Sequence, residues 1–402
     1  MRATTVALAH PVDLNDLAAG DGFLFVRDGV GIAGRGVAAR VADHQVAAAL
    51  AAIDHENDMG GSAGDSASGR SPIAIGCIPF EPGLPGTLVI PSLLVGKAAD
   101  GTAWVTRIEG GDEAPPELIA ALRPPPRAQR FTVEPVTPID RYLAAVTAAR
   151  DAVRAGELAK AVIAREIAIH SDEPIDVHAV LLRLRASFGS SHRYSVDGFI
   201  GASPELLVSV EGTTVRSHPL AGTAPRTGDP ATDQRAATEL LASAKNQIEH
   251  RIVIDMIHDT LLPWCSYLDW EPEPSIVAVA NVQHLATAME GRLSEPRPHV
   301  VELVRALSPT PALGGFPRTE ALALIARREG FARGRYGGAV GWTDANGDGT
   351  WAVAIRCAEF SADRCSARLV AGGGIVADSE PLSELAETQA KLQAMLSAIV
   401  RP

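Results

Sequence analysis

Glu249 is a carboxylate on what the sequence predicts to be the apolar face of a helix. Ile252, Val253 and Met256 follow it at the i+3, i+4 and i+7 positions, which lie on one side of a helix. A carboxylate in such surroundings is costly unless a cation or a ligand compensates its charge. The spacing leaves two explanations open: an ion pair with Lys245, four residues earlier, or coordination of a metal ion.

Glu384 and Glu387 form a second acidic pattern, on a final helix that the sequence predicts to begin near Ser379. With Lys391 they occupy the i, i+3 and i+7 positions, which span an arc of roughly 60° at about 100° per residue. Apolar residues such as Leu392 occupy the neighbouring face. Two carboxylates beside an apolar face can hold Mg²⁺, which prefers oxygen ligands. A solvated acidic stripe explains the same pattern.

Lys160 and Glu205 are candidates for proton transfer. Only four of the 36 basic residues are lysines, and Lys160 begins an apolar, β-branched run. A desolvated lysine can act as a general base, whereas arginine cannot lose its proton. Glu205 lies in a second strand-like run, FIGASPELLVSV, where burial would raise its pKa and let it serve as an acid. The patterns alone do not separate these roles from structural ones.

The elements that must position these residues are strand-like hairpins and longer helices. Helices are expected at about 138–156 and 230–262, and strands at 160–170 and 192–218. Strands clustered in hairpins with long helices between them predict an α+β fold with large antiparallel sheets.

Two glycine-containing motifs match the start of a ligand site but lack the residues that such a site needs. DANGDG at 344–349 begins like an EF-hand loop, yet Ile355 stands where a bidentate glutamate is required. Strand-like sequence flanks it, so Asn346-Gly347 predicts a hairpin turn. GGGIVA at 372–377 fits a dinucleotide fingerprint, but the 25 residues that follow are too few for the rest of that unit. Its glycines still permit close backbone approach to a ligand.

Composition excludes several classes of protein. A 46% hydrophobic content supplies a sizeable core, and a net charge of −12 argues against general nucleic-acid or anionic-membrane binding. Four cysteines without a C-x-x-C pair indicate neither a disulfide framework nor a zinc ribbon. No stretch reaches about 18 apolar residues and no secretory signal is recognisable, so a cytoplasmic protein is expected. The small polar residues at 57–71 predict a flexible loop.

Taken together, these segments resemble the chorismate-utilising enzymes, which include isochorismate, salicylate, anthranilate and aminodeoxychorismate synthases. The similarity is carried by KAVIARE (160–166), FIGASPELLV (199–208), HPLAGTAPR (218–226), SAKNQIEH (243–250), VQHLAT (282–287), PTPALGGFPR (309–318), RYGGAVGW (335–342), AIRCAE (354–359) and AGGGIVADSEPLSELAETQAKL (371–392). The resemblance implies two large antiparallel sheets with helices packed outside. It makes residues 135–402 the chorismate-binding catalytic region and residues 1–134 a strand-rich N-terminal part of the same fold.

The resemblance also implies roles for the residues above. Lys160 corresponds to the general base that activates water, and Glu205 to the general acid for the leaving 4-hydroxyl. Glu249, Glu384 and Glu387 correspond to the ligands of Mg²⁺. The implied substrate-binding residues are Thr223, His284, Ala312, Leu313, Tyr336, Arg356, Gly372, Gly374 and Lys391.

Within this family, three positions favour isochorismate synthase. Lys160 implies water as the nucleophile, because the ammonia-using members usually carry glutamine there. Ala221 in PLAGT replaces the lysine of aminodeoxychorismate synthases, and Ala312 replaces the threonine common in salicylate and anthranilate synthases. Asn246 departs from the family pattern, where many relatives carry an acid, so one family metal contact is not matched.

The predicted activity is therefore Mg²⁺-dependent conversion of chorismate to isochorismate, for menaquinone or siderophore biosynthesis. The alternatives are a salicylate synthase, which would go on to eliminate pyruvate, and a non-catalytic chorismate-binding protein. Because water replaces ammonia, no glutamine amidotransferase subunit is expected, and we expect a monomer.

Overall fold

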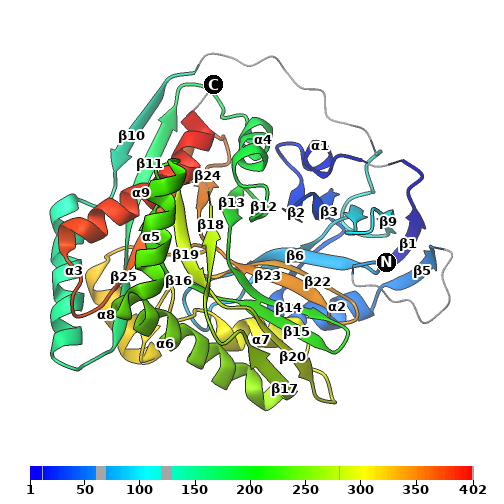
Figure 1. Cartoon of the computed structure of the whole chain (residues 1–402). Coiled ribbons are helices and arrows are strands. Elements are labelled where there is room, and N and C mark those ends of the chain that lie inside the picture. The colour runs from blue at the N-terminus through cyan, green and yellow to red at the C-terminus, as the bar shows by residue number, and fades with distance from the viewer. Residues whose placement is uncertain (11, 60–68, 119–128, 280, 401–402) are drawn as a thin grey trace.

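The computed structural model describes residues 1–10, 12–59, 69–118, 129–279 and 281–400 (Figure 1). Most of the loop predicted at 57–71 lies outside these residues, so that prediction is not tested. Two large sheets and one small sheet dominate the described chain (Figure 1).

The largest sheet has 13 strands among the described residues. In spatial order these are β10 (Phe131–Pro135), β11 (Lys160–Ser171), β25 (Ser366–Ile375), β24 (Cys357–Phe360), β13 (Phe199–Ser203), β12 (His192–Val196), β2 (Phe23–Arg27), β3 (Val30–Arg35), β8 (Leu93–Lys97), β9 (Ala103–Glu109), β1 (Arg2–Ala7) and β5 (Asp54–Asp58), with β21 (Gly315–Phe316) beside β11.

The second sheet has nine described strands and the third has three. The second contains β17 (Cys265–Trp270), β20 (Met289–Leu293), β15 (Thr214–His218), β14 (Leu206–Glu211), β23 (Gly349–Val353), β22 (Ala339–Asp344), β6 (Ile73–Ile78), β7 (Thr87–Ile90) and β4 (Ala39–Ala42). The third contains β16 (Leu220–Pro225), β19 (Val282–Ala286) and β18 (Ser275–Ala278).

The predicted α+β class with two large antiparallel sheets is confirmed. The small third sheet and the parallel pairing of β1 with β5 were not predicted. Strands from residues 1–134 enter both large sheets: β2 pairs with β12, and β6 pairs with β22.

The helices are distributed over all three sheets, and only some of them lie beside β11 and β25 (Figure 1). They are α1 (Leu14–Ala18), α2 (Val46–Ala51), α3 (Ile139–Arg154), α4 (Val177–Ser187), α5 (Pro230–Ala242), α6 (Ala244–Leu261), α7 (Val300–Leu307), α8 (Arg318–Arg328) and α9 (Pro381–Val400), with 3₁₀ turns at Asp43–Gln45 and Leu262–Trp264. None of those described is both long enough and apolar enough to cross a membrane.

One helix prediction needs correction, and the predicted start of the last helix is confirmed. The single helix expected at 230–262 is two helices, because Ser243 adopts an extended conformation and its side chain caps α6 by accepting a hydrogen bond from the Asn246 N–H. The last helix begins at Pro381, close to the start expected near Ser379, and the Ser379 hydroxyl accepts a hydrogen bond from the Val376 N–H at 3.2 Å.

The two glycine-containing motifs, at 344–349 and 372–377, form a hairpin turn and part of a strand. Residues 344–349 form the hairpin between β22 and β23, as the Asn-Gly turn predicts. Gly372 and Gly374 lie within β25, which runs antiparallel to β11, so the segment is not the parallel strand of a dinucleotide-binding unit.

The hydrophobic core forms two layers. One lies between the large sheets and includes Phe25 and Val340. The other lies between the opposite face of the first sheet and α4 and α9, and includes Ile200 and Leu392. The first sheet is therefore covered on both faces, and side chains at the end of β11 and β25 are shielded from water.

Candidate active site

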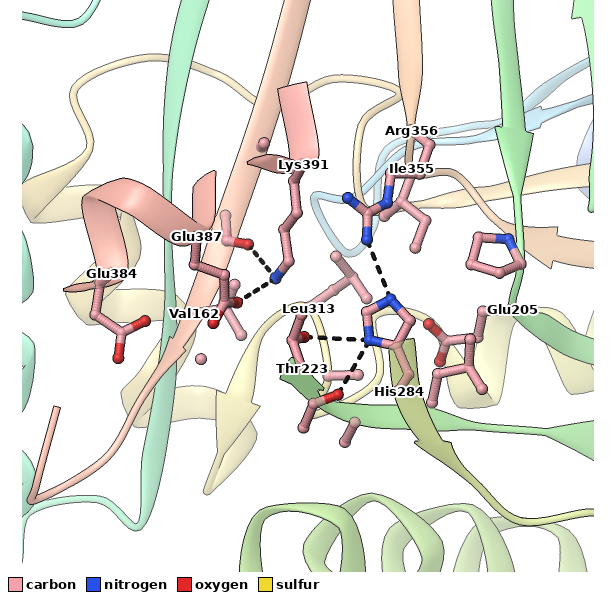
Figure 2. Close-up of a pocket in the computed structure, with 18 of the residues that line it drawn as sticks. Val162, Glu205, Thr223, His284, Leu313, Ile355, Arg356, Glu384, Glu387 and Lys391 are labelled. Carbon is pink, nitrogen blue, oxygen red and sulfur yellow. Dashed lines mark hydrogen bonds and ion pairs between the residues drawn. The ribbon is translucent and has the colours of Figure 1, made fainter. Parts of the chain in front are cut away.

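One cavity of about 230 Å³ brings together every residue that the sequence singled out for chemistry. Its lining contains Lys160, Glu205, Thr223, Glu249, His284, Ala312, Leu313, Tyr336, Arg356, Gly372, Gly374, Glu384, Glu387 and Lys391. These residues come from sheet strands, from α6 and α9, and from connecting segments. Figure 2 labels several of them, including Glu205, His284 and Arg356. Strands and helices far apart in the sequence thus meet at one enclosed place.

Lys160 is the first residue of β11 and is only 1% exposed. Its Nζ lies 2.8 Å from Oε1 of Glu249 on α6. Glu249 therefore pairs with Lys160 and not with Lys245, whose Nζ instead lies 3.9 Å from Oε1 of Glu384. Burial acts to raise the pKa of Glu249, but the ammonium of Lys160 outweighs it together with the nearby Lys391 and Lys245, so this pKa lies below its usual value.

Glu205 follows Pro204 at the end of β13 and is 3% exposed. Burial raises the pKa of its carboxyl group to about 8, although a backbone hydrogen bond from Leu220 and the charge of Lys160 limit the rise. A carboxyl group with this pKa is mostly protonated at neutral pH. It can therefore donate a proton to a leaving group inside the cavity.

Arg356 gives the cavity a cationic corner, where its guanidinium contacts the ring of His284 (Figure 2). His284 Nδ1 lies 3.0 Å from the Gly222 carbonyl oxygen, so Nδ1 carries the proton and Nε2 accepts from Arg356 Nη2 at 3.1 Å. Burial and the charge of Arg356 lower the pKa of His284 to about 3, which keeps its ring neutral. Thr223 Oγ1 contacts the same ring at 3.1 Å.

The second terminal nitrogen of Arg356, Nη1, is buried and has no hydrogen-bond partner among the described residues. A guanidinium held on one side and free on the other is suited to receive a carboxylate. The arrangement therefore offers an anchor for an anionic substrate.

Two carboxylates of α9 approach the backbone of β25. Lys391 Nζ lies 2.6 Å from Glu387 Oε1 and donates to the Gly372 carbonyl at 2.9 Å (Figure 2). Burial and the neighbouring Glu387 raise the pKa of Glu384 to about 7. A Cβ atom at Gly373 would lie only 2.9 Å from Glu384 Oε2, so this glycine leaves room for the carboxylate.

The predicted metal ligands fit Mg²⁺ in their chemistry. Glu249, Glu384 and Glu387 all supply oxygen, and all lie against the Gly373-Gly374 backbone of β25. Their side chains are not gathered as a coordination shell: among the described residues, no three His, Cys, Asp or Glu side chains are placed to hold one ion. Glu249 forms an ion pair with Lys160. Asn246 also lines the cavity, and its Nδ2 donates a hydrogen bond to Ser243 Oγ at 2.9 Å.

Sequence reasoning missed a buried ion pair behind the cavity, between Glu329 and Arg333. Arg333 donates to the carbonyl oxygens of Leu313 and Val162, each at 2.7 Å, and Glu329 Oε1 accepts from the Ala164 N–H at 2.7 Å. The pair thus fixes two segments that line the cavity. The only signal was an acid and a base four residues apart, just beyond the end of α8, which does not indicate burial.

Comparison with known proteins gives concordant results. The family described as chorismate binding enzyme matches residues 89–400. A putative isochorismate synthase MenF of Mycobacterium tuberculosis is 40% identical over 345 residues, which cover 83% of this chain and 87% of that protein. Isochorismate synthase DhbC of Bacillus subtilis is 37% identical over 344 residues, covering 83% and 82%.

A solved structure is also similar along nearly the whole chain. It is a putative 2,3-dihydroxybenzoate-specific isochorismate synthase, DhbC, from Bacillus anthracis. The TM-score is 0.79 at 32% sequence identity, and the match covers 96% of this chain and 98% of that one.

Proposed function

This chain belongs to the chorismate binding enzymes, and from that membership we propose that it is an isochorismate synthase, which adds water at C2 of chorismate and releases the C4 hydroxyl group. The observation that carries the proposal is the burial of Lys160 and Glu205 in one cavity with the half-free guanidinium of Arg356. A base, an acid and an anion anchor are the groups that this reaction requires.

Chorismate binding would begin with the attraction between its carboxylates and the guanidinium of Arg356. Arg356 Nη1 receives a carboxylate of chorismate, while the neutral ring of His284 holds the guanidinium in place. Tyr336 and Leu313 line the same cavity and limit how the ring can lie. Binding in one orientation brings C2 and C4 to the groups that act on them.

Lys160, which pairs with Glu249 as an ammonium, would act as the base after it has released its proton, and its amine would then take a proton from water as the water oxygen bonds to C2. The two ring double bonds shift, the C4–O bond breaks, and protonated Glu205 delivers its proton to the departing hydroxyl, which leaves as water. One water enters and one leaves, so the reaction is an isomerisation. Each proton transfer contributes about 10²–10⁴ in rate.

We propose that Glu249, Glu384 and Glu387 would hold Mg²⁺, which would place positive charge against a substrate carboxylate. Lys391 neutralises part of the same acidic cluster, because its Nζ contacts Glu387. The three carboxylates at the end of β25 would otherwise repel an anionic substrate.

The product assay tests the activity directly. The purified chain is incubated with chorismate and MgCl₂, and the products are separated by chromatography. We expect isochorismate alone, since Ala312 replaces the threonine expected of salicylate synthases. Salicylate with pyruvate would favour the salicylate synthase alternative, and chorismate left unchanged would favour a non-catalytic binding protein.

The assay also tests the expected independence from a partner. Because Lys160 implies water as the nucleophile, we propose that the chain acts as a cytoplasmic monomer without a glutamine amidotransferase subunit. Turnover should proceed in buffer without ammonia, and the mass measured by light scattering should be that of one chain. The isochorismate formed would serve menaquinone or siderophore biosynthesis, since the similar proteins carry names of both kinds.

A further inference from the structure

A second cavity, of about 530 Å³, shares no lining residue with the candidate active site. It lies between the start of α1, the β2–β3 turn and the loop that joins α4 to β12. Its size falls in the range of small-molecule sites, about 300–1,000 Å³. Lys97, the one lysine that does not line the candidate active site, contributes to it.

Arg193 is the buried cation of this cavity, with 1% of its surface exposed. Its Nη1 donates to Asn15 Oδ1 at 2.7 Å, whereas its Nε is buried and has no hydrogen-bond partner among the described residues. Burial lowers the pKa of Arg193 to about 10. A buried guanidinium with an unused donor is costly unless an anion compensates it.

The charges of Asp13 and Asp28 act on Arg193 across the cavity, but neither carboxylate forms an ion pair with it. Asp13 pairs with Arg185 at 2.6 Å, and Asp28 contacts Arg27 at 3.6 Å. Within the described part of the chain, no carboxylate forms an ion pair with Arg193 or with Lys97. Two of the cations that line the cavity, Arg193 and Lys97, thus have no ion-pair partner among the described residues.

We propose that this cavity binds the carboxylate or phosphate group of a small anionic metabolite, with Arg193 as the buried anchor and Lys97 as a second contact. The planar guanidinium presents parallel N–H donors that match either group. The site is separate from the chorismate cavity, so the proposal does not depend on the proposed function.

Calorimetric titration of the full-length protein at low ionic strength tests the site. Inorganic phosphate probes the phosphate class and citrate the carboxylate class, with sodium chloride as the ionic control. We expect at least one probe to bind, and Arg193→Met to weaken its affinity by about tenfold or more. Lys97→Met should weaken it several-fold, and Arg235→Met, which removes an exposed charge from α5, should leave it unchanged.

The same titration distinguishes the two cavities. Binding that survives in Arg356→Leu but is lost in Arg193→Met belongs to the second cavity, whereas the reverse result assigns it to the first and overturns the proposal. Absence of binding by both probes also overturns it. If circular dichroism shows that Arg193→Met is unfolded, Lys97→Met decides, because unchanged affinity in that folded variant contradicts the proposed contact.

Discussion

Glu205→Gln is the change that tests the acid role most directly, because it keeps the size and polarity of the side chain. Burial raises the pKa of Glu205 to about 8, so the wild-type group can donate a proton at neutral pH. A glutamine cannot. We expect turnover of chorismate to fall by about 10²–10⁴ while the protein stays folded.

The raised pKa also predicts an effect on stability. The folded-state pKa of about 8 lies above the ordinary value of 4.5, so the folded protein retains a proton that the unfolded chain releases. Stability from this group is fully present below pH 4.5, falls as the pH rises, and is lost above about pH 8. The difference between the two pKa values corresponds to about 5 kcal/mol as an upper bound.

Urea unfolding of wild type and variant at about pH 5 and pH 9 measures this difference. From pH 5 to pH 9, the free energy of unfolding of wild type should fall by several kcal/mol more than that of Glu205→Gln. The turnover of wild type should also decline above about pH 8. Glu239→Gln, at an exposed glutamate of α5, should follow the wild-type curve. Parallel pH dependence in wild type and Glu205→Gln would refute the burial argument, and normal turnover by Glu205→Gln would refute the acid role.

Three further predictions test the rest of the site. Lys160→Ala should lower turnover by about 10²–10⁴. Lys160→Arg should be equally slow, because arginine keeps its proton. Normal turnover by either variant in steady-state kinetics would contradict the base role. Combined Glu384→Gln and Glu387→Gln should abolish the Mg²⁺ dependence of chorismate binding, whereas an unchanged magnesium titration counts against the metal site. Glu329→Gln removes the ion-pair partner of the buried Arg333 and should lower the free energy of unfolding in urea by about 3–5 kcal/mol. The control, Asp255→Asn in an exposed pair, should lower it by about 1 kcal/mol or less. Equal losses would show that burial does not strengthen the first pair.

The fold was predictable where the local pattern and the tertiary environment agree. The strand expected at 160–170 is β11, Lys160–Ser171, because its β-branched run is buried between neighbouring strands. The hairpin at 344–349 follows from its Asn-Gly turn. The break between α5 and α6 was missed because Ser243 stands in otherwise helix-favouring sequence, and only the cap that it forms in the structure ends one helix and begins the next.

The candidate site was predictable in its membership but not in its contacts. The resemblance named the residues, and the structure places all of them around one cavity. The helix pattern identified Glu249 as a carboxylate in apolar surroundings that needed a partner. Besides a metal ion, it could suggest an ion-pair partner only on the same helix, namely Lys245, because periodicity says nothing about which other element packs there.

The actual partner, Lys160, is supplied by a strand about ninety residues earlier, and a glycine makes the contact possible. A Cβ atom at Gly374 would lie 2.4 Å from Glu249 Oε1 and 2.8 Å from Lys160 Cε, so any side chain there would displace the pair. Gly374 is opposite Val162 in the β11–β25 register, two residues beyond Lys160. The glycines of β25 therefore do more than allow a ligand to approach the backbone: at Gly374, the missing side chain is what lets the candidate base and a candidate metal ligand meet at 2.8 Å.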